Sequence, residues 1–245
     1  IKSSAASDVY KRQLNYDDKV LREFGKTIKN PVYFSRKEKP SKGAYLDGRI
    51  IRYFDGKNDY EVMSVDDMHL FGNHNYENVM AAIAMTIEAG VPLNIIINVI
   101  KDFMGVEHRI EYVRDKNGVR YYNDSKGTNP DSSIKALEAM SRPTILIAGG
   151  YDKHSEFDEF IEAFDNKVKL MVLLGQTADK IEETAVRHGF TNIIKTDSLE
   201  KAVKICAENA VSGDVVLLSP ACASWGMFKN YEERGKLFKE YVNSL

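Results

Sequence analysis

Hydrophobic residues recur along this chain in two different patterns. Over residues 14–64, short β-prone runs are separated by turn residues, and an Asp47-Gly48 pair between two of these runs predicts a hairpin. From residue 110 onward, compact apolar runs alternate with helical repeats. The runs predict strands at 110–113, 119–122, 144–148, 170–174, 192–195 and 215–218, and the repeats predict helices at 132–140, 156–164, 178–188, 199–209 and 232–242.

The second pattern predicts an α/β fold. Near-continuous apolar strands that alternate with helices indicate a mainly parallel sheet covered by helices on both faces. In such sheets, ligands bind beyond the carboxyl ends of the strands. Residues 14–64, by contrast, are expected to form the edge of a sheet, with too few strands for an independent domain.

Two helices are expected between these parts. Asn75 is a favoured N-cap residue, Gly90 ends the helical repeat that follows it, and Pro92 starts a second helix. His74 and Asn78 add an imidazole and an amide near the same helix start. Capping explains part of this cluster, and a binding site is the alternative interpretation.

Composition excludes several classes of protein. The 245 residues carry 34 basic and 36 acidic side chains, for a net charge of −2, so no nucleic-acid footprint is present. No apolar run approaches the length of a membrane span. Cys206 and Cys222 show neither disulfide nor metal-ligand spacing, which favours a reducing cytoplasm. Residues 1–13 are expected to be a disordered or non-native lead.

Polar residues follow the predicted strand at 119–122. The sequence indicates a strand, a tight loop and a helix start, where backbone N–H groups and the helix dipole favour anions. Lys126 adds an ammonium group, and Thr128 and Asn129 add donors. Asp124 adds a carboxylate that suits a metal, a ribose hydroxyl or Lys126 itself. A solvated, capped loop is the alternative interpretation.

Other predicted strands end in similar residues. Lys153 follows the strand at 144–148, and the serine-rich segment 219–224 follows the strand at 215–218. Two ammonium groups with hydroxyls suit an anion that carries more than one carboxylate or phosphate. No G-x-G-x-x-G follows Gly149, so hydride chemistry has no support. Cys222 is expected to be a small buried residue rather than a nucleophile.

Five motifs together resemble those of the Mur ligases, and the similarity is closest to the members that add D-glutamate. They are Gly-Asn-His-Asn-Tyr-Glu-Asn at 72–78, Gly105 with His108-Arg109, Asn-Asp-Ser-Lys-Gly-Thr-Asn at 123–129, Gly-Gly-Tyr-Asp-Lys at 149–153, and Ser-Pro-Ala-Cys-Ala-Ser-Trp at 219–225 with Arg-Gly at 234–235. The resemblance implies a C-terminal Rossmann-like domain at residues 105–245. The tail of a truncated central ATPase domain is implied at residues 14–104.

The resemblance also implies an activity, namely ATP-dependent amide-bond formation in peptidoglycan synthesis. ATP would phosphorylate the carboxylate of UDP-N-acetylmuramoyl-L-alanine, the amine of D-glutamate would attack the acyl phosphate, and phosphate would leave. ATP and Mg²⁺ are the implied co-substrate and metal. A cytoplasmic monomer with no nucleic-acid or membrane partner is expected, with a part in cell-wall biogenesis, cell shape and cell division.

Site residues are carried over position by position. Asn75, Asn78, Arg109 and Asp124 match the family's ATP contacts, and Lys126, Thr128, Lys153, Ser224 and Tyr231 match the residues that hold D-glutamate. Their implied work is orientation and charge neutralisation rather than acid–base chemistry.

The chain also departs from the family's pattern. It has no UDP-binding domain and no G-x-x-x-x-G-K-[ST] segment, so no catalytic residue or metal ligand is assigned within it, and the chain alone is expected to be inactive. Gly226 stands where an acidic residue is expected, and Tyr231 where phenylalanine is expected. A folylpolyglutamate-type ligase and a non-catalytic anion- or amino-acid-binding α/β module remain the alternatives.

Overall fold

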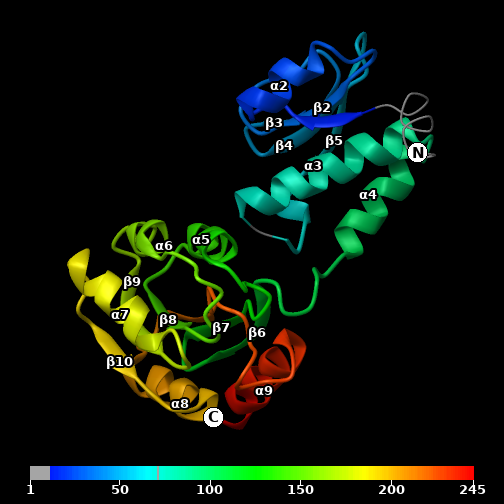
Figure 1. Cartoon of the computed structure of the whole chain (residues 1–245). Coiled ribbons are helices and arrows are strands. Elements are labelled where there is room, and N and C mark those ends of the chain that lie inside the picture. Colours follow the sequence, from blue (N-terminus) through cyan, green and yellow to red (C-terminus); the bar gives the residue numbers. More distant parts are fainter. Residues whose placement is uncertain (1–11, 71) are drawn as a thin grey trace. The chain divides into compact units, whose positions relative to one another are not determined.

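The computed structural model describes residues 12–70 and 72–245, and these form two compact units that divide between Met104 and Gly105 (Figure 1). Each unit has its own sheet and its own buried apolar cluster. The lead expected at residues 1–13 falls mostly outside the described residues. Gln13 is described, however, and it pairs with Val32 in a strand, so the expectation was wrong for this residue.

The first unit is built on a five-stranded sheet in the order β1-β2-β3-β4-β5. The first three strands are parallel, and β4 and β5 are antiparallel to their neighbours. The Asp47-Gly48 hairpin between β3 and β4 is confirmed. The elements are β1 (Gln13–Asn15), α2 (Lys19–Gly25), β2 (Val32–Ser35), β3 (Gly43–Asp47), β4 (Ile50–Phe54), β5 (Asp59–Ser64), η1 (Val65–Asp67), α3 (Asn73–Glu88) and α4 (Leu93–Asp102).

This sheet is more complete than the sheet edge expected from the sequence. Ile51 and Ala44 of the sheet pack with Met80 and Ile83 of α3 and Ile96 of α4, and all five side chains are buried. The two helices supply the apolar face that the short strands lack alone. The start of α3 also differs from expectation, because Gly72 (φ 92°) occupies the N-cap position and Asn75 lies inside the first turn.

The second unit contains a six-stranded sheet in the order β10-β9-β8-β11-β7-β6, which is parallel except for β6. The elements are β6 (Glu111–Lys116), β7 (Val119–Asn123), α5 (Pro130–Ala139), β8 (Thr144–Ala148), α6 (Asp158–Glu162), β9 (Val168–Leu173), α7 (Ala178–Arg187), β10 (Ile193–Lys195), α8 (Leu199–Asn209), β11 (Val215–Leu218) and α9 (Tyr231–Ser244). The expected α/β fold with a mainly parallel sheet is therefore confirmed.

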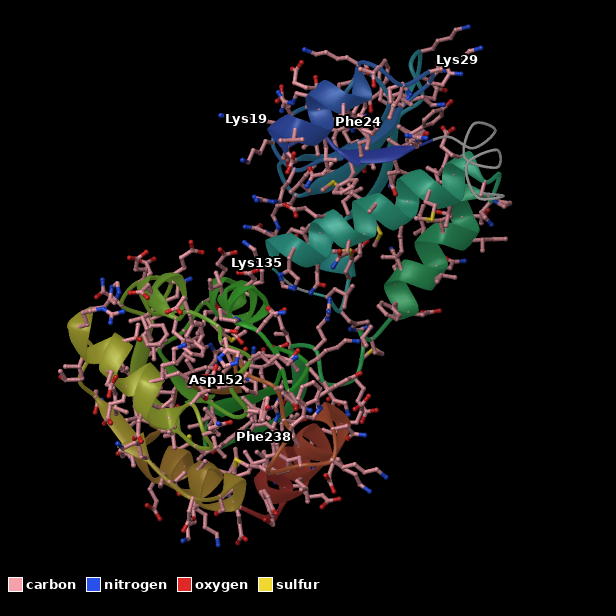
Figure 2. All side chains as sticks on the ribbon, in the orientation of Figure 1. Lys19, Phe24, Lys29, Lys135, Asp152 and Phe238 are labelled. Carbon is pink, nitrogen blue, oxygen red and sulfur yellow. The ribbon has the colours of Figure 1, made fainter. Side chains whose placement is uncertain are left out.

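Helices cover both faces of this sheet, with α5, α6 and α7 on one side and α8 and α9 on the other (Figure 1). On the second side, Cys206 of α8 and Phe238 of α9 are fully buried against sheet residues such as Ile147 and Val216. Phe238 lies within the second unit in Figure 2, whereas Lys135 projects from its surface. The central strands are apolar on both faces, so the sheet packs against a helix layer on each side.

Helix α6 is shorter than the helix that the repeat at 156–164 predicts. The segment before it is not helical, because His154 has a positive φ of 61° and its N–H binds the side chain of Asp152 at 2.7 Å. After it, Asp165 and Asn166 also have positive φ values, of 41° and 59°. The spacing of Phe157, Phe160 and Phe164 therefore predicts a longer helix than the structure contains.

The strand order positions the candidate site. β11 is the last strand in sequence, yet it lies between β8 and β7. The serine-rich loop after β11 therefore emerges between the loops that carry Lys153 and Lys126. Among the described residues, no helix is both long enough and apolar enough to cross a bilayer.

Candidate functional site

Backbone hydrogen bonds tie the loop after β11 to the loops on either side. The N–H of Asp124 donates to the carbonyl of Leu218 at 2.7 Å, and the N–H of Gly149 donates to that of Pro220 at 2.8 Å. The N–H of Tyr151 then donates to the carbonyl of Ala223 at 2.9 Å. These hydrogen bonds join the loops that follow β7, β11 and β8. We call the edge of the sheet formed by these three loops the rim.

The contact between the β8 and β11 loops requires a glycine. Gly150 has a φ of 156°, and a Cβ added there would lie 2.3 Å from the carbonyl oxygen of Ala223. A contact this short is not possible for a side-chain carbon, so any other residue would push the two loops apart. The Gly149-Gly150 pair therefore allows the backbones of the β8 and β11 loops to lie close together at this rim.

Asp124 is the buried carboxylate of the rim. It is only 4% exposed, its Oδ1 accepts the N–H of Ile110 at 3.2 Å, and its Oδ2 accepts the hydroxyl of Ser219 at 2.7 Å. Burial raises the pKa of Asp124 to about 7, against the opposing effects of these hydrogen bonds and of the charges of Arg109 and Arg234. The carboxyl group is consequently poised between its two protonation states near neutral pH.

Arg234 is a buried arginine beneath the same loops. Its Nε donates to the hydroxyl of Ser125 at 3.0 Å, its Nη2 to the carbonyl of Ser125 at 2.8 Å, and its Nη1 to the carbonyl of Cys222 at 3.2 Å. Burial lowers the pKa of Arg234 to about 10, so the guanidinium remains charged at neutral pH. One side chain from α9 therefore joins the loop after β7 to the loop after β11.

A second set of buried polar side chains, around Asn123, holds the first residues of the second unit in place. The Nδ2 of Asn123 lies 2.9 Å from Nδ1 of His108 and donates to Glu111 at 3.0 Å. A Cβ at Gly235 would lie 2.3 Å from the same His108 nitrogen, so α9 can pack here only with a glycine. The segment after Gly105 is thereby anchored to the end of β7.

Backbone strain is present on both sides of Arg109. His108 and Ile110 have φ values of 65° and 46°, and a left-handed conformation is uncommon for a β-branched residue. This conformation brings the N–H of Ile110 to Asp124, while Arg109 itself is exposed. The strain therefore presents a guanidinium group at the rim beside a buried carboxylate.

Both lysines of the rim lie against aromatic rings. Nζ of Lys126 is 5.5 Å from the ring centroid of Tyr231, and Nζ of Lys153 is 4.8 Å from that of Trp225. Lys153 is exposed and Lys126 is half-buried. The two ammonium groups belong to loops on opposite sides of β11.

The nine residues assigned by resemblance are divided between the two units. Asn75 and Asn78 lie in the first two turns of α3, in the first unit, where Asn75 is half-buried and Asn78 is exposed. The remaining residues gather on the rim of the second unit: Arg109, Asp124, Lys126, Thr128, Lys153, Ser224 and Tyr231. Thr128 is half-buried, with its N–H bound to the carbonyl of Lys126 at 2.8 Å.

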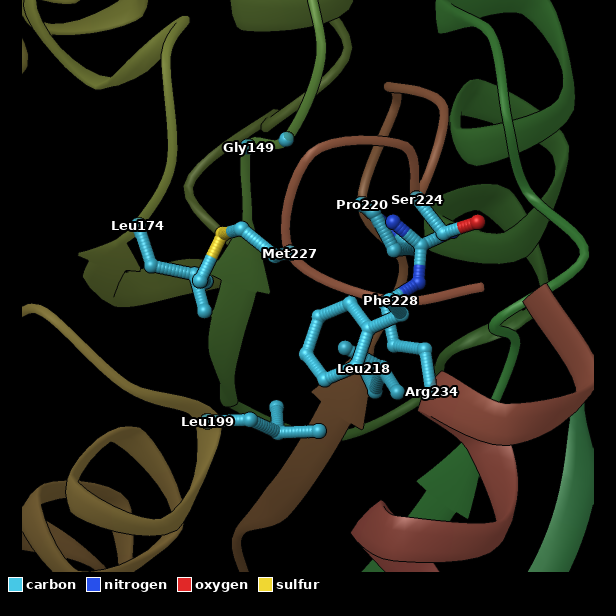
Figure 3. A pocket seen from close by; sticks show the side chains of 10 residues that line it. Gly149, Leu174, Leu199, Leu218, Pro220, Ser224, Met227, Phe228 and Arg234 are labelled. Carbon is cyan, nitrogen blue, oxygen red and sulfur yellow. The ribbon is translucent and has the colours of Figure 1, made fainter. Parts of the chain in front are cut away.

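Ser224 lines a small cavity behind the rim, together with Arg234 and apolar side chains (Figure 3). Its volume of about 10 Å³ is enough for about one water molecule. Arg234 reaches from α9 toward the loop of Pro220 and Ser224 in the same view (Figure 3). The space beneath this loop is too small for a substrate, so a ligand of this rim binds on its outer side.

Cys222 is buried, as expected. It is 4% exposed, its sulfur lies 3.2 Å from the hydroxyl of Thr177, and burial raises the pKa of its thiol to about 11. A thiol with so high a pKa is protonated at neutral pH and is a poor nucleophile.

Among the described residues, one cluster has the composition of a metal site, formed by Glu107, His108 and Glu111. The arrangement does not fit an ion. The ammonium of Lys239 binds both carboxylates, at 2.5 and 2.9 Å, and the carboxylates face opposite nitrogens of the imidazole ring. The position between the two acidic groups is thus already taken by the ammonium group of a lysine.

Comparison with known proteins decides the family. A family model described as "Mur ligase, glutamate ligase domain" matches residues 108–222. The UDP-N-acetylmuramoylalanine–D-glutamate ligase of Lachnospira eligens is 63% identical over 233 residues, which cover 95% of this chain and 52% of that protein. The chain belongs to the Mur ligase family. It spans about half the length of the curated relatives it matches.

Solved structures of related ligases have the same fold as this chain. A pseudomurein peptide ligase type C from Methanothermus fervidus aligns with a TM-score of 0.70 at 16% identity, over 96% of this chain and 56% of that one. The MurF ligase of Thermotoga maritima in complex with ADP aligns with a TM-score of 0.60 at 19% identity, over 95% and 53%.

Several residues that build the rim were not assigned from the sequence. Arg234, Ser125, Ser219 and Asn123 hold it together, although only neighbouring residues had been given roles. A signal was present for Arg234, because it shares one helix face with Phe238 at a spacing of four residues. An arginine on an otherwise buried apolar face indicates a buried polar contact.

The glycine that replaces the expected acidic residue has a structural consequence of its own. Gly226 has a φ of 83°, and open space surrounds the position of its missing Cβ. We expect Gly226→Asp and Gly226→Ala to lower the free energy of unfolding by about 1 kcal/mol each, since an L-residue is strained in this conformation. Urea unfolding measures both, and a loss above about 3 kcal/mol would show that packing rather than strain requires the glycine.

Proposed function

We propose that this chain provides the D-glutamate-binding rim and part of the ATP site of an ATP-dependent ligase in peptidoglycan synthesis. The reaction joins D-glutamate to UDP-N-acetylmuramoyl-L-alanine through an acyl phosphate. Two observations support the proposal: the name carried by relatives that are up to 63% identical, and the pair of aromatic-backed lysines on the loops that flank β11. Residues 14–104 would then belong to the ATP-binding domain and residues 105–245 to the glutamate ligase domain.

The rim would act on D-glutamate by charge neutralisation and orientation. D-glutamate carries two carboxylates, and Lys126 and Lys153 offer one ammonium group each from opposite sides of the β11 loop. Thr128, Ser224 and Tyr231 would add hydroxyl contacts around them. With both carboxylates bound by the lysines, the amine of D-glutamate is the group that remains available to react. An amine held close to an acyl phosphate attacks it much faster than an amine in solution does.

Asn75 and Asn78 of α3 are proposed as ATP contacts of the first unit. Arg109 and Asp124 of the rim are proposed as ATP contacts of the second unit. ADP in the Thermotoga maritima MurF structure supports ATP as the co-substrate. Arg109 is exposed and its backbone is held by the hydrogen bond of its N–H to Val106 at 3.1 Å, so its guanidinium can reach a phosphate or ribose. Mg²⁺ is part of the proposal only as the metal that accompanies ATP. The described residues offer no fitting site for it, so no step is assigned to it.

We further propose that the protein works in the cytoplasm as a monomer and contributes to cell-wall biogenesis, cell shape and cell division. The location is supported by the proposed reaction, because its nucleotide-sugar substrate and ATP are cytoplasmic molecules, and the part in cell-wall biogenesis is supported by its peptidoglycan product.

The lysine pair gives the direct test. We expect Lys126→Met and Lys153→Met each to weaken binding of D-glutamate by about 10-fold or more, because each removes a charge-assisted hydrogen bond. Isothermal titration calorimetry of D-glutamate into the chain measures the change. Lys236→Met is the matched control, since this lysine is exposed on α9 and pairs only with Glu240 at 3.9 Å in the described residues.

Two results would contradict the proposal. The first is equal binding by the wild type and both lysine variants, and the second is binding of L-glutamate that is tighter than that of D-glutamate. The second result would favour the folylpolyglutamate-type alternative over a D-glutamate ligase.

A further inference from the structure

The chain contains a single tryptophan, Trp225, and it lies next to one of the two rim lysines. Nζ of Lys153 is 4.8 Å from the centroid of its ring. Trp225 also meets Tyr151 edge-to-face, with ring centroids 5.6 Å apart. Trp225 and Tyr151 are 54% and 40% exposed, so neither ring is part of the core.

The surrounding backbone holds Trp225 in place. The carbonyl of Ser224 accepts the N–H of Phe228 at 3.0 Å, which closes a turn that presents Trp225 outward. On the other side, the bridge between Tyr151 and Ala223 joins the two loops that carry the rings. The exposed indole is thus carried by a backbone that is held on both sides and packs against Tyr151, and exposed aromatic rings supported in this way are common in binding surfaces.

A fixed ring changes what Lys153 can do. An exposed lysine normally samples many rotamers, and much of that freedom is lost when it binds a ligand. The indole face attracts the ammonium group electrostatically and restricts this sampling before any ligand arrives. Only one side of the ammonium faces the ring, so its remaining N–H groups stay available to a carboxylate.

We propose that Trp225 is a positioning residue for D-glutamate, which holds the ammonium of Lys153 ready for one of the two carboxylates. The inference rests on the proposed function and extends it to a residue that the resemblance did not assign. Lys126 has the same arrangement with Tyr231 at 5.5 Å, so both ammonium groups of the rim would be held by rings that follow β11 in the chain, Trp225 in the loop and Tyr231 at the start of α9.

Fluorescence of Trp225 tests the contact itself. We expect Lys153→Met to change the emission of the wild-type chain, because it removes a positive charge from the indole face. Lys236→Met is expected to leave the emission unchanged. We also expect D-glutamate to change the emission of the wild type in a saturable way, with the dissociation constant that calorimetry gives. Emission that does not respond to Lys153→Met would overturn the inference.

Binding to variants tests the positioning role. We expect Trp225→Leu to weaken D-glutamate binding about 2- to 5-fold, and Trp225→Phe to restore it to within about 2-fold of the wild type, because phenylalanine keeps an aromatic face. Thermal unfolding of both variants should match the wild type, since the ring is half exposed.

The outcomes separate the two proposals. If the chain binds D-glutamate through Lys126 and Lys153 but Trp225→Leu binds as well as or better than the wild type, the positioning role is wrong and the proposed function stands. If the wild type does not bind D-glutamate at millimolar concentration, the proposed function fails and the inference fails with it.

Discussion

Replacement of Arg234 by alanine is expected to lower the free energy of unfolding by about 3–5 kcal/mol. The side chain is 2% exposed and donates three hydrogen bonds to Ser125 and Cys222. Alanine would leave these oxygens buried without a donor, would create a cavity, and would remove a positive charge that stabilises the ionised form of Asp124.

Urea unfolding followed by Trp225 fluorescence measures this effect in the correct unit, since the only tryptophan lies in the second unit. Lys236→Ala on the same helix is the control, and we expect it to change the free energy by no more than about 0.5 kcal/mol. Arg234→Lys should recover part of the loss, because an ammonium group can reach one carbonyl but not three acceptors. A loss below about 1 kcal/mol for Arg234→Ala would mean that the two loops stay joined without it.

Asp124→Asn is expected to change how stability depends on pH. In the folded chain the pKa of Asp124 is raised to about 7, above the value of about 4 expected for an unfolded chain. The folded state therefore holds the proton more tightly than the unfolded state. This stabilisation is complete below pH ~4 and disappears as the pH rises through ~7, and in total it amounts to about 4 kcal/mol.

The wild type should consequently lose stability between pH ~4 and ~7 relative to Asp124→Asn, whose amide does not titrate. Urea unfolding of both proteins across this range measures the difference in slope. Glu240→Gln, a change at an exposed carboxyl group of α9, should give a curve parallel to that of the wild type. Parallel curves for Asp124→Asn and the wild type would show that the pKa of Asp124 is not raised in the folded chain.

The sequence predicted the strands of the second unit well. The observed bounds of β8 and β11 match the predicted runs at 144–148 and 215–218 residue for residue. Both strands are buried on both faces and are bounded by proline, glycine or polar residues, so a continuous apolar run is a sufficient signal. The hairpin between β6 and β7 turns at Asn117-Gly118, whose positive φ values of 53° and 78° suit these residue types.

Long-range contacts were not predictable in the same way. Arg234 binds Ser125 across 109 residues, and no local pattern names its partner. The left-handed conformation of Ile110 opposes its own residue preference, so only the hydrogen bond to Asp124 explains it. The full extent of the five-stranded sheet of the first unit was missed because its short strands signal little until α3 and α4 cover them.

The position of β11 has a consequence for the order in which the second unit becomes functional during synthesis. This strand is made near the end of the chain, but it joins β8 to β7 in the centre of the sheet. The hairpin of β6 and β7 and the parallel strands β8, β9 and β10 can form earlier, yet they remain two separate pieces until residues 215–218 leave the ribosome. Lys126 and Lys153 are carried on different pieces. A nascent or truncated chain that ends before β11 therefore lacks the proposed D-glutamate site, whatever its degree of local folding.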